Sequence, residues 1–301
     1  MNPKPSPLSA LILGIPNPVS MGIARGWQMA GYRIAAIWYP ERLEKTLVFS
    51  QDRELAAKAP GLTLAGLRDR AGISTRAIPR LKDWNGAVAA ARTLKPDVVI
   101  SLLFPDRITE PMLNAFPGRV VNLHPSLLPA YRGPHPVLNM LWDETIGEHS
   151  GFTLHLVSAA FDLGDIIARR AVPFPATRNV SAYYMELVKA GTGLLTEELS
   201  GYVRGTISPA PQDPDAPAPL GTRSPRRAIL TPDLTAARIQ WLCSTIPQVT
   251  RLVIEGLPDR IGVTAFVGPE GPPTGAPPLA AGDTVSLDAS DARVSVRVSF
   301  L

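Results

Sequence analysis

Four short apolar runs in the first half of the chain constrain the fold most strongly. They are rich in Val, Ile and Leu, and runs of this length fit strands that are buried on both faces of a sheet. The runs cover residues 9–15, 33–39, 97–104 and 119–124. Segments with helical character lie between them, at residues 21–30, 53–59 and 84–94. Strands that alternate with helices predict an α/β fold with a doubly wound, mostly parallel, Rossmann-like sheet.

The middle of the chain continues with further predicted elements. A helix is expected over residues 135–144, and two neighbouring strands over residues 151–158 and 165–174. A long amphipathic helix is expected over residues 181–203, with Ser181 as its N-cap because a serine oxygen can accept from the first free backbone N–H groups.

A proline-rich segment then interrupts the pattern. The stretch SPAPQDPDAPAPLG, residues 208–221, holds five prolines and predicts a linker or an extended surface strap. A helix over residues 231–246 and four short strands separated by turns follow it, which indicates a small β-barrel or an open sheet. We therefore expect an α/β domain over residues 1–205, a linker over 206–227 and a smaller β-rich, barrel-like domain over 228–301.

Composition excludes several classes of protein. Cys243 is the only cysteine, which excludes a disulfide framework and a multi-cysteine zinc site. The formal net charge of +4 is a mild basic excess. The sequence contains no block of five or six Lys or Arg residues of the kind that indicates a strong nucleic-acid-binding surface. Pro16 and Pro18 cut short the first apolar run, so we interpret it as a strand and not as a signal peptide. No run reaches the roughly 18 apolar residues of a membrane span, and we expect a cytoplasmic protein without membrane contact.

All four histidines lie between His124 and His155. For His135 and His149 we expect ordinary structural roles. A metal site is disfavoured, because no pair of histidines has i, i+4 spacing, no H-x-x-E motif occurs and cysteine ligands are missing. We expect no bound metal.

Asn122 and His124 stand out from the other polar residues. They alternate on one face at the end of a predicted strand, and the carboxyl ends of parallel strands form the ligand crevice of such sheets. An amide and an imidazole side by side suit a carbonyl group, since one donates to the developing oxyanion while the other moves a proton. Asp162 and Asp165 are the candidate carboxylates to complete the set.

These motifs resemble a known family. The chain is similar here to the formyltransferases that use 10-formyltetrahydrofolate. The similarity lies in the stretch NLHPSLLPAYRG and the later stretch GFTLHLVSAAFDLGDII. The shared motifs are N-x-H, S-L-L-P, R-G and then a strand that ends in D-x-G. The resemblance is firm over residues 97–173, looser over residues 9–96, and only architectural from residue 223 onward.

The resemblance implies a catalytic set of Asn122, His124 and Asp162 in a catalytic domain over residues 1–205. Asp162 is preferred to Asp165 because it stands two residues before Gly164, as in the family's D-x-G. The implied reaction is attack of an amine on the formyl carbon, with Asn122 and His124 stabilising the oxyanion while Asp162 tunes His124. No metal takes part in the implied reaction.

The resemblance also implies two binding regions. The folate would lie between the loops of residues 101–108 and 157–161, with Leu102, Phe104 and Ala160 as candidates, although Leu102 and Phe104 are equally suited to filling core. The acceptor would lie near the first loop and the Y-R-G motif. The candidates there are Asn17, Ser20, Met21 and Arg132, with a solvated surface position as the alternative for Arg132.

The nature of the acceptor is less constrained. The two-part layout resembles methionyl-tRNA formyltransferases and sugar N-formyltransferases. A tRNA acceptor is disfavoured, because the linker is rich in Pro and Asp and few Lys and Arg residues are available to contact phosphates. SLLFPD and HPS also depart from the patterns usual in the tRNA enzymes. We therefore expect a small-molecule amine, such as an amino sugar or a biosynthetic intermediate, with tRNA as the alternative acceptor. Two further alternatives are a formyltetrahydrofolate hydrolase and a non-catalytic folate-binding module, and the sequence does not address oligomeric state.

Overall fold

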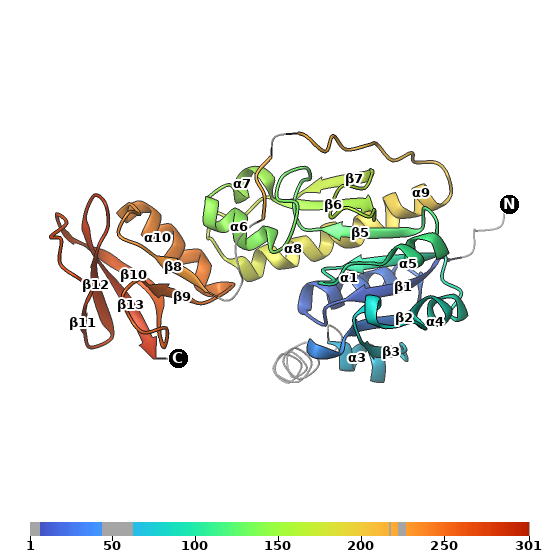
Figure 1. Ribbon diagram of the computed structural model, residues 1–301, viewed down its shortest axis with the longest axis horizontal. Helices are drawn as coiled ribbons and strands as arrows, with labels where there is room; N and C mark the ends of the chain where they lie inside the picture. The colour runs from blue at the N-terminus through green and yellow to red at the C-terminus, as the bar shows by residue number, and fades with distance from the viewer. Residues whose placement is uncertain (1–6, 44–62, 217, 222–226, 301) are drawn as a thin grey trace. The chain divides into compact units, whose positions relative to one another are not determined.

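The computed structural model describes residues 7–43, 63–216, 218–221 and 227–300. The helix predicted over residues 53–59 lies outside the described residues. The chain divides into two compact units (Figure 1). Unit 1 takes in Met1–Gly133, His149–Val172 and Tyr184–Leu220, and unit 2 takes in Pro134–Glu148, Pro173–Tyr183 and Gly221–Leu301.

Unit 1 is built on a seven-stranded sheet with the order β3-β2-β1-β4-β5-β6-β7. The first five strands in this order are parallel to one another, whereas β6 is antiparallel to both of its neighbours, β5 and β7. The predicted doubly wound, mostly parallel sheet is therefore confirmed. The strands are β1 (Ser9–Gly14), β2 (Arg33–Pro40), β3 (Thr75–Ile78), β4 (Val98–Leu102), β5 (Val120–His124), β6 (Gly151–Leu156) and β7 (Ile166–Ala171).

Helices cover both faces of this sheet because alternate strand residues point to opposite sides. On one face, Leu11 and Leu13 of β1 share a buried cluster with Ala91 of α4 and Met112 of α5. On the other face, α1 packs so closely against α8 that a Cβ on Gly191 would lie 2.7 Å from Ile23 Cδ1. The helices and short 3-10 turns before β6 are α1 (Pro18–Met29), η1 (Glu41–Leu43), α3 (Leu64–Asp69), η4 (Leu81–Asp83), α4 (Ala87–Thr93), α5 (Glu110–Ala115), α6 (Pro136–Asp143) and α7 (Ile146–His149).

The long helix predicted over residues 181–203 is present but differs in detail. It runs as α8 (Val180–Gly193), continues as a π-helical segment η5 (Leu194–Leu199) and ends as α9 (Ser200–Val203). Ser181 as the N-cap was wrong, because the Asn179 side chain accepts from the backbone N–H of Ala182 at 2.9 Å. Asparagine caps a helix start at least as well as serine, and here it stands one residue before the first helical position.

The C-terminal part of unit 2 has an open sheet with the order β10-β13-β12-β11, all antiparallel. The barrel-like form expected for this part was wrong, since β10 and β11 remain the two edges among the described strands. Val294, Val296 and Val298 of β13 are buried. The elements are β8 (Ala228–Leu230), α10 (Ala236–Thr245), η6 (Ile246–Gln248), β9 (Leu252–Ile254), β10 (Ile261–Gly271), β11 (Leu279–Ala281), β12 (Thr284–Asp288) and β13 (Arg293–Phe300).

The proline-rich segment up to Leu220 lies along unit 1 as an extended strap. Ala210 forms an antiparallel bridge with Ile166 at the start of β7, and Leu220 forms a parallel bridge with Arg132. Over residues 207–216 and 218–220 the alternative of a surface strap therefore describes the chain better than that of a free linker. In the parts of the chain that the structure describes, no helix has the length and apolar character needed to span a membrane.

Candidate active site

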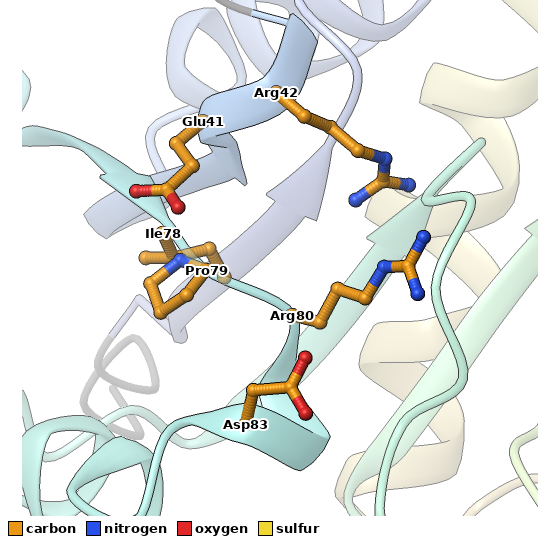
Figure 2. A pocket seen from close by; sticks show the side chains of 6 residues that line it. All are labelled: Glu41, Arg42, Ile78, Pro79, Arg80 and Asp83. Carbon is orange, nitrogen blue, oxygen red and sulfur yellow. The ribbon is translucent and has the colours of Figure 1, made fainter.

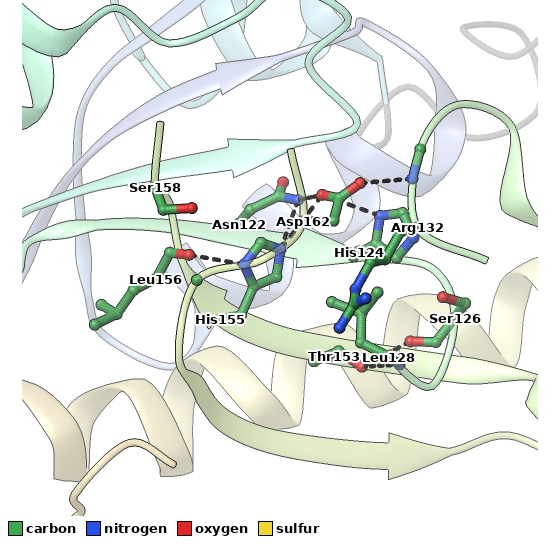
Figure 3. A network of polar contacts seen from close by, with 12 residues as sticks. Asn122, His124, Ser126, Leu128, Arg132, Thr153, His155, Leu156, Ser158 and Asp162 are labelled. Carbon is green, nitrogen blue, oxygen red and sulfur yellow. Dashed lines mark hydrogen bonds and ion pairs between the residues drawn. The ribbon is translucent and has the colours of Figure 1, made fainter. Parts of the chain in front are cut away.

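Asn122 and His124 lie at the carboxyl end of β5, beside the carboxyl end of β4 (Figure 3). In this sheet the chain continues from β1 to β2 on one side and later returns to β4 on the other side of β1. Such folds form their ligand crevice at the carboxyl ends of the strands where the order reverses in this way. The antiparallel strand β6 places His155 directly opposite Asn122. The sheet therefore gathers an amide and two imidazoles at one edge.

Asp162, in the loop between β6 and β7, completes the cluster. Its Oδ1 lies 3.6 Å from His124 Nδ1 and 3.4 Å from Asn122 Nδ2. Its Oδ2 accepts from the backbone N–H of Gly133 at 2.9 Å (Figure 3). The side chains of His124 and Asp162 are only 6% and 10% exposed, so their charges act in a poorly hydrated environment. The three residues implied to be catalytic thus meet around one carboxylate, whereas their catalytic role stays a prediction.

Close packing of the backbone requires glycine at the last position of the D-x-G motif. A Cβ on Gly164 would lie 1.8 Å from the Leu156 carbonyl oxygen, far inside van der Waals contact. Only glycine allows the returning loop to pass so close to the end of β6. This close approach turns the chain so that Asp162 points back toward β5.

The hydrogen bonds of His124 fix which ring nitrogen is free. Its Nε2 lies 2.8 Å from the carbonyl oxygen of Tyr131, which can only accept, so Nε2 carries the proton in the neutral ring. Nδ1 then carries a lone pair instead of a proton, and it faces Asp162. Burial lowers the pKa of His124 below its ordinary value, against the opposing effects of Asp162 and the Tyr131 carbonyl. At neutral pH the ring is therefore neutral and able to accept a proton at Nδ1.

Asp162 is ionised in the same conditions. Burial alone would raise the pKa of its carboxyl group, but the neighbouring imidazoles of His155 and His124 and the Gly133 N–H outweigh burial and lower it to about 2. A neutral base next to a fixed carboxylate is an arrangement that accepts a proton and stabilises the resulting imidazolium.

His155 is a member of the cluster that the sequence did not reveal. Its Nδ1 donates to the Leu156 carbonyl oxygen at 2.8 Å, so its Nε2 accepts from Asn122 Nδ2 at 3.1 Å. These bonds orient the Asn122 amide with its nitrogen toward Asp162. Only the pairing of β5 with β6 puts His155 against Asn122.

The two loops predicted to hold the folate lie against each other. Arg107 donates a hydrogen bond to the Ala159 carbonyl oxygen, and Phe104 packs half-buried on the same apolar cluster as Val157. Of the predicted contact residues, Leu102 is only 1% exposed, whereas Ala160 is exposed. Folate contacts by Leu102, Phe104 and Ala160 stay predictions.

The predicted acceptor residues of the first loop have structural partners. Asn17 caps α1 through a bond from the Ser20 backbone N–H to its side-chain oxygen, Ser20 Oγ donates to the Leu102 carbonyl oxygen, and Met21 is buried. The Arg132 guanidinium donates to the side-chain oxygen of Gln212 and to strap carbonyls. Contacts of these four residues with an acceptor stay predictions.

A pocket lies on the same edge of the sheet, where β2 and β3 end (Figure 2). Two arginines and two carboxylates line it, and none of the predicted site residues does. Its lining residues are Glu41, Arg42, Ile78, Pro79, Arg80 and Asp83. Among the described residues, no group of three or more His, Cys, Asp and Glu side chains is placed to hold a metal ion.

Known proteins with similar sequences cover the region of the cluster. A sequence model described as formyl transferase matches residues 56–199, which include all four clustered side chains. The methionyl-tRNA formyltransferase of Roseiflexus sp. (strain RS-1) is 37% identical over 144 residues, or 48% of this chain and 43% of that protein. The chain therefore spans less than half the length of this curated relative.

Solved structures share the fold over nearly the whole chain. An N-formyltransferase from Helicobacter canadensis, in complex with folinic acid and dTDP-3-aminofucose, has a TM-score of 0.65 at 14% identity, covering 96% of this chain and 98% of that chain. HypX from Aquifex aeolicus, in complex with tetrahydrofolic acid, has a TM-score of 0.61 at 17% identity, covering 97% of this chain and 44% of that chain. The match over residues 56–199 takes in just under half of the chain, and this segment, which holds the buried Asn–His–Asp cluster, is similar to the formyl transferase family.

Proposed function

We propose that this protein transfers a formyl group from 10-formyltetrahydrofolate to a primary amine of a small molecule. The observation that carries the proposal is the free Nδ1 of His124, which faces the ionised Asp162 at 3.6 Å at the carboxyl edge of the sheet. In the reaction a bond forms between the amine nitrogen and the formyl carbon, and the bond from that carbon to the folate nitrogen breaks. The products are the N-formyl amine and tetrahydrofolate.

His124 is the proposed base. Its Nδ1 takes the proton that the amine loses on attack, and the Asp162 carboxylate stabilises the imidazolium. The same proton is then available to the leaving folate nitrogen, so that the net charge of the site is the same after the reaction as before it. The bond between His124 Nε2 and the Tyr131 carbonyl keeps the ring in the tautomer that this step requires.

Asn122 is the proposed donor to the developing oxyanion. One of its N–H groups is directed to His155 at 3.1 Å, and the other has only a long contact of 3.4 Å to Asp162. The second N–H is the one available to a substrate oxygen, because turning away from Asp162 gives up a weak bond. One such donor typically contributes about 3–4 kcal/mol to transition-state stabilisation.

The donor class is supported by the family and by the two loops that meet beside the cluster. Proteins of the same fold are described in complex with folinic acid and tetrahydrofolic acid. The half-buried Phe104 offers an apolar surface next to the loop of residues 157–161. Phe161 adds an aromatic side chain that is 64% exposed, one position before Asp162. Aromatic and apolar groups beside a few polar ones are typical of such ligand sites.

A direct assay tests the proposal. The protein is incubated with 10-formyltetrahydrofolate and a panel of amino sugars and other biosynthetic amines, and N-formyl products are detected by mass spectrometry. Asn122→Ala and His124→Ala should each lower turnover by roughly a hundredfold or more. The matched control is His135→Asn, which removes an exposed imidazole and tolerates the positive φ of this position. Near wild-type turnover in either cluster variant would show that the reacting groups lie elsewhere, and formate release without an amine would indicate a hydrolase.

Methionyl-tRNA is the second candidate acceptor. The curated relatives with 36–37% identity over this segment are methionyl-tRNA formyltransferases. The sequence favours a small molecule instead, because the net charge is only +4 and the proline-rich segment is acidic at its centre. Adding charged methionyl-tRNA to the same assay separates the two, since formylation of the tRNA together with silence toward every small amine would favour the tRNA.

A further inference from the structure

We propose that the strap, residues 207–216 and 218–220, is part of the framework of the active site and that Gln212 is a positioning residue for Asp162. This inference rests on the proposed function, since it concerns the groups that would carry the reaction. It assigns a role to a segment whose composition alone predicts a linker or a surface strap. The argument depends on contacts that the strap makes with both loops of the cluster.

Gln212 holds the loop of Asp162 through its side-chain amide. Its Nε2 donates to the Asp162 carbonyl oxygen at 2.9 Å and to the Gly164 carbonyl oxygen at 2.7 Å. Its Oε1 accepts from Arg132 Nη2 at 3.1 Å. Both amide hydrogens and the amide oxygen are therefore used, and only an amide supplies two donors and an acceptor on one short side chain.

The backbone that Gln212 binds is in an unfavourable conformation. Asp162 has a φ of 54°, in the left-handed region that residues with a side chain rarely adopt. Such a conformation persists when surrounding contacts determine it. The two bonds from Gln212 lie on either side of Leu163, so they clamp the turn that aims the Asp162 carboxylate at His124.

The far end of the strap holds the second loop. Tyr131 also has a positive φ, of 58°, and its backbone N–H donates to the Pro219 carbonyl oxygen at 2.6 Å. The carbonyl of the same Tyr131 accepts from His124 Nε2. The strap thus binds the residue that fixes the His124 tautomer, just as Gln212 binds the residue that faces His124 Nδ1.

Arg132 joins the middle of the strap to the loop that contains Tyr131. Its guanidinium donates to the carbonyl oxygens of Asp213 at 2.9 Å and Pro214 at 3.3 Å, besides Gln212. The next residue, Gly133, donates its N–H to Asp162 Oδ2. One short segment of backbone therefore joins the strap to the carboxylate, and proline stiffens the strap so that these bonds cost little ordering entropy.

The test replaces Gln212 while keeping its size. Gln212→Met removes both donors and the acceptor, and Gln212→Glu keeps the shape but sets a carboxylate against two carbonyl oxygens. The matched control is Asp215→Ala, an exposed side chain on the same strap. Amide hydrogen exchange is measured for Gly133 and Ile166, whose N–H groups bond to Asp162 and to the strap. We expect both amides to exchange roughly tenfold faster in the Gln212 variants than in the wild-type protein. In the control the exchange rates should be unchanged.

A second readout separates positioning from mere support. In protein labelled with ¹³C-histidine, four imidazole signals are expected, and the His124 signal is assigned by its loss in His124→Ala. We expect it to shift in Gln212→Met and Gln212→Glu at a fixed pH, while it stays in place in Asp215→Ala. In the formyl transfer assay the same variants should lose roughly tenfold in kcat with little change in KM for 10-formyltetrahydrofolate.

The outcomes are distinguishable. Unchanged exchange at Gly133 and Ile166 in a folded variant would overturn the clamp. Faster exchange with an unmoved His124 signal would reduce the strap to a structural support and overturn the positioning role. Absence of formyl transfer by the wild-type protein would count against the proposed function alone, because exchange and the histidine signals need no substrate.

Discussion

At the scale of single residues, the protonation of the cluster follows from its hydrogen bonds. Tyr131 offers a carbonyl to His124 Nε2, and Leu156 offers a carbonyl to His155 Nδ1. Each imidazole is thereby held in a different tautomer, one with a free Nδ1 and the other with a free Nε2. The free nitrogens face Asp162 and Asn122, so the two histidines divide the tasks of moving a proton and orienting an amide.

The first prediction separates the two carboxylates of the loop. Asp162→Asn should lower formyl transfer by roughly a hundredfold or more, because it removes the charge that stabilises protonated His124. Asp165→Asn should keep most activity, since Asp165 contributes its backbone carbonyl, to the Leu156 N–H, in a bond that the substitution leaves intact. Steady-state rates of both purified variants decide the matter. The reverse ranking would mean that Asp165 is the reacting carboxylate.

The second prediction concerns pH. His124 acts as a base only while neutral, and burial lowers its pKa below the ordinary 6.5. The acid limb of kcat/KM should therefore have its midpoint below pH 6.5, with activity retained above it. The Asp162 carboxylate raises the His124 pKa, so any residual activity of Asp162→Asn should have a limb at still lower pH. A pH–rate profile of both proteins measures the two midpoints, and a wild-type limb above pH 6.5 would contradict the assignment.

Sequence patterns identified most of this cluster, but not all of it. Asn122 and His124 are two positions apart on one strand, so period-two alternation puts them on one face without any knowledge of the fold. His155 is 33 positions away from Asn122 and meets it only through the antiparallel pairing of β5 and β6. Gln212 is farther still, and no local pattern connects it with Asp162.

At the scale of elements, the loop between β6 and β7 determines where Asp162 points. It must pass the end of β6 so closely that the Leu156 carbonyl oxygen lies where a side chain at position 164 would begin. The D-x-G spacing is therefore a consequence of backbone packing as well as of chemistry. The close approach between position 164 and the Leu156 carbonyl oxygen is compatible only with glycine.

The third prediction tests that contact. Gly164→Ala should destabilise the protein by on the order of 2–4 kcal/mol and lower activity, because the backbone must shift to remove a 1.8 Å overlap. Gly147→Ala in α7 is the control, since nothing lies within 4 Å of its Cβ position, and its effect should stay within about 1 kcal/mol. Urea unfolding monitored by circular dichroism gives both values. Equal stability of the two variants would show that the loop does not pass as close as described.

Helix boundaries were less predictable than strand positions. The start of α8 differs by one residue from the expected one, because Asn179 and Ser181 are both good caps and the sequence does not choose between them. The π-helical segment Leu194–Leu199 has no signal in the apolar periodicity. Strands β1, β4 and β5 were found because buried parallel strands are continuous apolar runs.

At the scale of the whole molecule, the units do not follow the order of the chain. Unit 2 joins residues 134–148 and 173–183 to the segment that begins at Gly221. Trp241 of α10 is one connection between these segments, as its indole N–H donates to the Leu141 carbonyl oxygen at 2.6 Å and its ring packs near Phe174. A cut after residue 205 would remove these partners from Leu141 and Phe174.

The fourth prediction follows from that connection. Trp241→Ala should destabilise the protein by on the order of 2–4 kcal/mol, since it removes the indole hydrogen bond, the ring contact with Phe174 and the stacking of Arg178 at 4.7 Å. Trp241→Phe should cost less, because a ring remains. Val267→Ala is a control at a 52% exposed position and should change stability by less than about 0.5 kcal/mol. Chemical denaturation measures all three, and an unaffected Trp241→Ala would refute the role of α10.

The sequence by itself determined the α/β class and the residues of the N-x-H and D-x-G motifs. These features depend on periodicity and on neighbours within a few positions, which a single sequence records directly. Only the tertiary structure decided that the C-terminal sheet is open, that His155 joins Asn122, and that the proline-rich segment lies on unit 1 as a strap. Each of these depends on a hydrogen-bonded pairing between distant parts of the chain, and such pairings are selected by the packing of the whole fold and leave no local periodicity in the sequence.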